Sequence, residues 1–384
     1  MKFSFSNIIQ SFLKILKNPP EESIKEKMVM SNRDLLRFQE ILQADKDQIH
    51  QPFVTTSSEE RKIIRTIREQ VFIHNENNVT RTSAYLKYFL RNPNVHWAFL
   101  AHMVSRNGGY YMTDLKSSFF KDIIPSHEQK RYFLFLERCN AYIFQDAFPQ
   151  LLLYEYCVKV NKPMFHLLKG FNVSSFMIPL WESFFNNKNS EAITIGMIIN
   201  EQKMLGERVL KILYQSHSVL DELPYKLQET LGLTTVLFPY RSKQSERYKL
   251  YGQEVKNFSD VDERITIGKK LYQILFSKYV FESSFQFANH NVHTGSRKDY
   301  WGWLFTNDEH SKEEKIYSPP LFHAWSNVEH SFRQKQDWFG QDNLDVIKKL
   351  HTLPEVKDYD LTTKIAGQYT VLQAFDHINE SLLN

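Results

Sequence analysis

Helical periodicity dominates the pattern of apolar and polar positions along the chain. Capping-box signatures, in which Ser or Asp precedes Glu or Gln by three residues, stand ahead of apolar-periodic runs at Ser57, Ser126 and Asp260. Prolines such as Pro149 stand where helices start or break. Asn107-Gly108-Gly109 is typical of a left-handed C-cap. The pattern therefore predicts an all-α protein.

We expect the predicted helices to pack around one core, with at most one short β-hairpin beside them. The one convincing strand-like run is Thr234 to Phe238, which Gly232 and Pro239 bound. Among the predicted helices are 94–106, 127–146, 150–160, 190–216 and 262–286.

Residues 1–17 have the spacing of an amphipathic helix. Phe5, Ile9 and Phe12 share one face, while Lys14 and Lys17 lie on the other side. Polar residues interrupt every apolar run, which excludes a membrane span or a signal-peptide core. Two interpretations stay open: weak contact with an anionic membrane surface, or a helix that docks on its own domain or stays disordered.

The chain divides, on this pattern, into an arm and one large domain. Asn18-Pro19-Pro20 ends the N-terminal helix, and helical patterns then recur almost without interruption. We expect residues 1–75 to form a helical N-terminal arm and residues 76–384 a single all-α domain. No repeat period is visible, which argues against a solenoid.

Composition narrows the class of protein further. The 48 Lys and Arg against 44 Asp and Glu give a net charge of +4, so nucleic acid is not an expected partner. Aromatic residues make up 14% of the chain, which predicts an aromatic-rich core. With 12 Gly, glycine-rich nucleotide folds are disfavoured. Cys139 and Cys157 cannot form a disulfide framework, which indicates a reducing, cytoplasmic compartment.

Glu201 is the first candidate for chemistry. It lies beside Gln202 in a helix that is otherwise apolar, and a carboxylate there needs a partner or takes up a proton. We expect it to be buried, with an Arg or His of another helix within hydrogen-bonding reach. Arg208 on the same stripe would be a strained partner. The alternative is a core hydrogen bond that only fixes the fold.

The segment 289–305 has the densest chemistry in the chain. Gly295 permits a turn that points amides outward, Thr294 and Ser296 add hydroxyl donors, and Arg297 can fork onto two oxygens. This combination suits phosphate or carboxylate, with His293 and Asp299 as acid and base beside it. We expect Arg297 to face the main cavity, which Arg106 or Glu201 would share. The alternative is a structural loop that Trp301 and Trp303 anchor.

Metal and nucleotide motifs are missing from the sequence. His290 and His293 have H-x-x-H spacing, but no carboxylate or Cys set at ligand spacing accompanies them. No P-loop and no dinucleotide fingerprint occurs. We therefore expect neither a metal nor a cofactor.

Several longer strings stand out beyond these short motifs. Among them are Asn78-Val79-Thr80-Arg81-Thr82, Ser105-Arg106-Asn107-Gly108-Gly109, Phe144-Gln145-Asp146-Ala147-Phe148-Pro149, Asn200-Glu201-Gln202 and His293-Thr294-Gly295-Ser296-Arg297. Together they resemble the YppC-like proteins, a family of unknown function from Gram-positive spore-forming bacteria. The resemblance covers roughly residues 75–340. It implies a cytoplasmic bacterial protein, with no known cofactor and no assigned catalytic residue.

Polar residues of these strings supply the candidate site. Two hypotheses follow: a polar pocket between helices that binds a small anionic or phosphorylated molecule, with or without catalysis, or a scaffold or peripheral membrane protein whose polar core is structural. Convergence of the side chains on one open cavity would favour the first hypothesis. The candidates for catalysis are Glu201, His293 and Asp299, and those for ligand binding are Arg106, Asn107, Asp114, Asp146, Thr294, Ser296 and Arg297.

Overall fold

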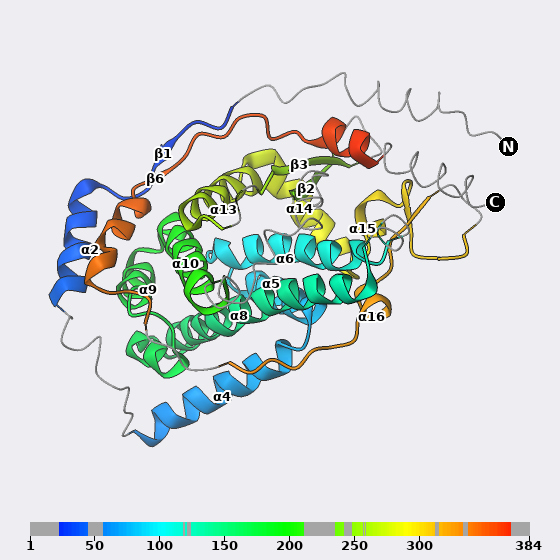
Figure 1. Ribbon diagram of the computed structural model, residues 1–384. Helices are drawn as coiled ribbons and strands as arrows, with labels where there is room; N and C mark the ends of the chain where they lie inside the picture. The colour runs from blue at the N-terminus through cyan, green and yellow to red at the C-terminus, as the bar shows by residue number, and fades with distance from the viewer. Residues whose placement is uncertain are drawn as a thin grey trace.

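Long helices make up most of the structure, so the predicted helical class is confirmed (Figure 1). The computed structural model describes residues 23–44, 57–117, 120, 124–210, 235–241, 248–255, 257, 259–311, 315–332 and 337–369. The amphipathic pattern of residues 1–17 lies outside these ranges. The longer helices are α2 (Asn32–Ala44), α4 (Ser58–His74), α5 (Asn78–Arg91), α6 (His96–Asp114), α8 (Ser126–Val160), α9 (Met177–Asn187), α10 (Ser190–Leu205), α13 (Val261–Leu275) and α14 (Lys278–His290). Shorter helical segments are η1 (Phe165–Phe171), η2 (Gly206–Leu210), α15 (Lys298–Trp301), α16 (Leu321–Ala324) and η4 (Gln341–Leu350).

Helices α5, α6 and α8 run alongside one another in the middle of the molecule, and α4 packs on the outer side of α8 (Figure 1). Helix α10 packs against both α6 and α8, and α13 lies against α10. This arrangement brings four helices, α6, α8, α10 and α13, around a shared interior region. The candidate site described below lies there.

Helix starts follow the sequence signals in part. Ser57 caps α4 by accepting a hydrogen bond from the Glu60 amide, and Asp260 caps α13 in the same way. The signature at Ser126 is wrong as a cap, because α8 starts after Pro125 without a side-chain cap. A reciprocal capping box starts α5 instead, in which the Asn77 and Thr80 side chains each accept a hydrogen bond from the backbone N–H of the other residue.

Three predicted helix boundaries are wrong. Helix α6 continues through Asn107-Gly108-Gly109 to Asp114, and α8 continues through Pro149 to Val160. Packing decides both cases, since these stretches are buried against neighbouring helices and the tertiary contacts outweigh local propensity. The predicted helix over 262–286 is two helices, which Phe276 and Ser277 separate.

Strands are few and short in the described residues. The predicted strand-like run forms β2 (Val236–Tyr240), which pairs antiparallel with β3 (Lys249–Gln253). The periodicity did not reveal the two-residue pairings, β1 (Lys27–Met28) with β6 (Thr352–Leu353) and β4 (Phe305–Thr306) with β5 (Ile316–Tyr317). The first pair is antiparallel and the second parallel.

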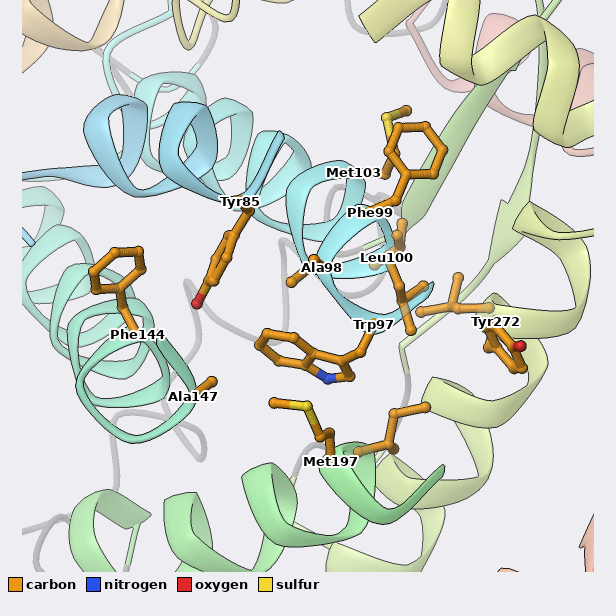
Figure 2. Packing of buried hydrophobic residues seen from close by; sticks show 14 of the residues in the cluster. Tyr85, Trp97, Ala98, Phe99, Leu100, Met103, Phe144, Ala147, Met197 and Tyr272 are labelled. Atoms are coloured by element: carbon orange, nitrogen blue, oxygen red, sulfur yellow. The ribbon is translucent and has the colours of Figure 1, made fainter. Parts of the chain in front are cut away.

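The core is rich in aromatic rings, as the composition predicts. Figure 2 shows Trp97 of α6 between Tyr85 of α5 and Met197 of α10, with Phe144 of α8 on the far side of Tyr85. The Tyr85 and Trp97 rings meet edge to face, with centroids 5.5 Å apart. Trp97 is therefore both a core residue and, on another side, part of the cavity described next.

Candidate functional site

A cavity of about 200 Å³ lies between α6, α8, α10 and α13. Most of its walls are apolar side chains, and the polar groups on them are few. Apolar cavities of about 150 Å³ in proteins admit a molecule the size of benzene. The cavity therefore has room for a small organic molecule of about that class.

Small residues occur at the helix faces that meet around the cavity, namely Ala101 and Gly108 on α6 and Gly268 on α13. An added Cβ would lie 3.3 Å from Asn140 Nδ2 at Gly108 and 2.7 Å from Ile198 Cγ2 at Gly268, so the two glycines allow α6 and α13 to approach α8 and α10 closely. The contributing residues of α6 recur at helical spacing, which places them on one face of that helix. They are Trp97, Leu100, Ala101, Val104, Ser105, Gly108 and Tyr111.

Glu201 of α10 supplies the carboxyl group of the cavity wall. Its Oε1 accepts a hydrogen bond of 2.7 Å from the Gln202 side chain. Burial raises the pKa of Glu201 to about 8, and the nearby Asp146 carboxylate adds to the rise. Gln202 and Arg264 act in the opposite direction. Near pH 7 the Glu201 side chain is therefore mostly a neutral carboxylic acid.

Arg264 of α13 is the cation on the cavity wall. It is buried, and its Nε donates to Gln202 Oε1 at 2.8 Å while Nη2 donates to the Gln202 carbonyl oxygen at 3.2 Å. Glu201 is half-buried, so its predicted burial holds in part, and Arg264 is an arginine of another helix that acts on it electrostatically. The hydrogen bonds that Glu201 accepts come from Gln202 and Trp97, and Arg264 is held by the same glutamine.

Asp146 of α8 lies behind Glu201 and is buried. Its Oδ2 accepts from Asn200 at 2.6 Å and from Gln150 at 2.9 Å, while Oδ1 is 3.9 Å from Arg208 and has no hydrogen-bond partner. Burial raises the pKa of Asp146 to about 6, which Arg208 opposes. Asp146 does not line the cavity, but it sets the electrostatic field at Glu201.

The loop from His293 to Asp299 does not line this cavity. Arg297 is 1% exposed, and its Nε and Nη2 donate hydrogen bonds of 2.6–3.1 Å to the carboxylate oxygens of Asp114. Its Nη1 donates to the Tyr300 hydroxyl at 2.8 Å. The expectation that Arg297 faces a cavity shared with Arg106 or Glu201 is therefore wrong for this cavity. A guanidinium so buried is satisfied by a protein carboxylate instead.

His293, Asp299 and Arg106 form a second buried group. The His293 Nε2 is 2.9 Å from Asn78 Oδ1, and its Nδ1 is 3.5 Å from Asp299 Oδ2. Arg106 donates to the Asn291 carbonyl oxygen at 2.9 Å and lies 3.8 Å from the same carboxylate oxygen. Burial lowers the pKa of His293, against the effect of Asp299. These three side chains meet one another and not Glu201.

The remaining candidates form hydrogen bonds within the protein. Asn107 exchanges hydrogen bonds with the Leu237 amide and carbonyl, so it pairs with β2 as a strand neighbour would. The Thr294 hydroxyl donates to Asp299 Oδ1 at 2.7 Å, and the Ser296 hydroxyl donates to the Ser318 carbonyl oxygen. Gly295 has φ 87°, which confirms the turn that the sequence predicts. Both hydroxyl donors are therefore already used, one inside the loop and one toward Ser318.

Among the described residues, no group of three or more His, Cys, Asp and Glu side chains is placed to hold a metal ion. Within the same ranges, no helix combines the length and apolarity that a bilayer crossing requires.

The sequence was compared with protein families, curated proteins and solved structures. Residues 73–369 match the family model described as "Protein of unknown function (DUF2515)". The chain belongs to the DUF2515 family. It is 38% identical over 279 residues to "Uncharacterized protein YppC" of Bacillus subtilis (strain 168), an alignment of 73% of this chain and 84% of that protein. No solved structure matches it significantly. The resemblance to the YppC-like proteins is thus confirmed, and with it DUF2515 membership, which names no activity.

Of the sequence-based candidates, Glu201 alone lines the cavity of this DUF2515 protein. Arg264 is not among those candidates, although it shares a helical face with Ile267, Gly268 and Leu271, which all line the cavity. A charged residue on an otherwise apolar helix face was the signal that singled out Glu201. The same signal, applied to residues 261–275, would have found Arg264.

Proposed function

We propose that this protein binds a small, predominantly apolar molecule in the cavity between α6, α8, α10 and α13. The observation that carries the proposal is a ligand-sized cavity with mostly apolar walls and a few polar groups, Glu201 and Gln202 among them. Concave, mostly apolar sites with a few convergent polar groups are the usual form of small-molecule sites.

The sequence predicts an anionic or phosphorylated ligand, and the cavity favours a different one. That prediction depended on Arg297 and its neighbours, which pair among themselves and with Asp114. At the cavity, an anion would meet mostly apolar walls, a carboxyl group and an Arg264 guanidinium that already donates to Gln202, so transfer of its charge out of water would be costly. The proposal therefore keeps the pocket between helices and changes the class of ligand.

A binding experiment with small aromatic probes tests this function. We expect indole and acetophenone to bind with one-to-one stoichiometry in isothermal titration calorimetry and to change the fluorescence of Trp97, which lines the cavity. The Trp97→Phe variant should lose the fluorescence change. No binding of either probe at millimolar concentration would overturn the proposal and favour the structural alternative.

A matched pair of variants shows where the probes bind. Ala101→Leu adds a side chain to the cavity wall and should abolish binding, because the added carbons occupy the space. Ala192→Leu makes the same change on the partly exposed first turn of α10, outside the cavity, and should bind as the wild type does. Equal probe affinity of all three proteins would refute the cavity as the site.

A further inference from the structure

The polar end of the cavity has an unusual composition. Within the described part of the chain, Glu201 is the one carboxyl group and Arg264 the one cation among the residues that line the cavity. The other walls are mostly apolar, with Leu100, Phe135 and Leu271 among them, and their polar side chains, such as those of Ser105 and Asn140, are neutral. Glu201 and its neighbours therefore supply the acidic and basic groups that a bound molecule meets, and we expect them to select the ligand.

The Arg264 guanidinium already forms hydrogen bonds within the protein. Its Nε and Nη2 donate to the side chain and the carbonyl oxygen of Gln202, and the side chain is buried. A carboxylate ligand would have to displace these contacts and also lose its hydration against apolar walls. The geometry therefore disfavours an anion as the ligand.

A cation is also disfavoured, because the carboxyl groups here already face arginines. Arg208 lies 3.9 Å from Asp146, and Arg264 lies close enough to Glu201 to lower the pKa of its carboxyl. An ammonium group would find no excess negative charge to offset the loss of its hydration. The titratable and charged groups that act on Glu201 or border the cavity beside it are Tyr85 from α5, Tyr111 from α6, Cys139 and Asp146 from α8, and Arg264 from α13. Arg208 from η2 faces Asp146 in turn.

The protonation of Glu201 determines what it can offer. Burial and the Asp146 carboxylate raise the pKa of Glu201 to about 8, so the side chain keeps a proton at neutral pH. A protonated carboxyl group has one O–H donor in addition to its acceptor oxygens. Gln202 Nε2 donates to Oε1 and the Trp97 indole N–H also donates to Glu201, so neither of these hydrogen bonds uses the O–H of the protonated carboxyl group.

We propose that Glu201 donates a hydrogen bond to an uncharged acceptor oxygen, such as that of a ketone, ester or amide, at one end of an otherwise apolar ligand. This inference rests on the proposed function, because it needs the cavity to be a ligand site. The ligand is then a small neutral molecule with an apolar body and a hydrogen-bond acceptor at one end. Binding is then coupled to the proton on Glu201.

Three probes of similar size and different charge test the ligand class. Acetophenone is a neutral ketone, 1-phenylethylamine is a cation at neutral pH, and benzoate is an anion. In calorimetric titrations of the wild-type protein at pH 6.5, we expect acetophenone to bind tightest. Tighter binding of benzoate or of 1-phenylethylamine would overturn the inference while supporting the cavity as a site. Failure of all three to bind would overturn the proposed function itself.

The pH dependence tests the role of Glu201. The ligand accepts its hydrogen bond from the protonated form of Glu201, and the fraction of this form decreases above the pKa. The affinity for acetophenone should therefore fall roughly tenfold for each pH unit above about 8. Glu201→Gln has a permanent amide donor, so it should bind acetophenone at pH 6.5 and lose this pH dependence. The matched control is Glu191→Gln at the first turn of the same helix, where Glu191 pairs with Lys27, and it should behave as the wild type.

Two results would overturn the role of Glu201. One is an unchanged pH dependence in Glu201→Gln, and the other is loss of acetophenone binding at pH 6.5 in a variant whose circular dichroism and melting temperature are those of the wild type. The ranking of the three probes needs no variant, so it tests the ligand class even if Glu201→Gln does not fold.

Discussion

Within the described ranges, the three arginine side chains that are only 1% exposed each lie close to a carboxylate. Arg81 pairs with Glu137 at 2.5 Å and Arg297 with Asp114 at 2.6 Å, while Arg106 lies 3.8 Å from Asp299. Removing charges from water is costly, and such pairs persist only when the geometry and the added hydrogen bonds compensate. The pairs join segments far apart in the sequence, so they fix how those segments meet.

The Arg297–Asp114 pair gives a direct test of that structural role. Asp114→Asn leaves the Arg297 guanidinium charged and buried without a counter-charge, so we expect the free energy of unfolding to fall by about 3–5 kcal/mol in urea denaturation. The control is Asp345→Asn, whose pair with Lys348 is exposed to solvent and screened, and which should leave stability nearly unchanged. A comparably small effect of both variants would show that Asp114 is not needed for the fold.

Glu201 makes the stability of the protein depend on pH. Its pKa is raised from the usual 4.5 to about 8 by burial, so between these values the folded protein holds a proton that the unfolded chain has released. Stability from this group is therefore complete below pH 4.5 and is lost as the pH rises toward 8, by up to about 1.4 kcal/mol per pH unit. Denaturation at several pH values should show this slope in the wild type. Glu201→Gln should lack that part of it, and equal slopes would contradict the assignment.

At the residue scale, the sequence predicts which polar groups enter the interior better than it predicts their partners. Glu201 could be placed on the interior because it interrupts a periodic apolar face. The pairing of Arg297 with Asp114 could not, because the two lie 183 positions apart and nothing local to either specifies the other. For the same reason the loop around Gly295 could be predicted to turn but not to face away from the cavity.

Helix ends show what local sequence rules miss at the scale of an element. Gly108 and Gly109 are typical of a helix end, yet α6 passes through both of them. The glycines are needed for close approach: Gly109 faces His293 and Asn78, which hydrogen-bond across it. Tertiary packing thus explains residues that local patterns assign to a cap.

Gly109→Ala tests this explanation. An added Cβ would lie 2.5 Å from His293 Nε2 and 2.6 Å from Asn78 Oδ1, so it would separate α5, α6 and the loop after α14. We expect a loss of about 1–3 kcal/mol in the free energy of unfolding, measured in urea. At Gly302 an added Cβ has no neighbour closer than 3.6 Å, so Gly302→Ala should be tolerated. If Gly109→Ala were as stable as Gly302→Ala, close approach would not be the reason for this glycine.

At the scale of the whole molecule, the two ends of the described chain meet. Strand β1 pairs with β6, and Ile24 forms a further antiparallel bridge with Val356 (Figure 1). Helix α2 packs against η4 and α9, where the Phe38 ring meets Phe176 edge to face at 5.9 Å. The division into an arm of residues 1–75 and a domain of residues 76–384 stays a prediction, and these contacts show where to test it.

Two truncations decide how far the N-terminal segment belongs to the core. Deletion of residues 1–44 removes β1 and α2, and with them the buried Phe38 and Leu42. At about 1.5–3 kcal/mol for each large apolar side chain, we expect the loss of α2 to lower the free energy of unfolding by about 3–6 kcal/mol. The sequence predicts that deletion of residues 1–17 leaves the fold intact, so this shorter truncation is the control. Equal stability of the two truncated proteins would show that residues 18–44 are not needed for the fold, as the predicted arm requires. A large loss confined to the longer truncation would instead make α2 part of the domain, because η4 and α9 need its apolar face for their own burial.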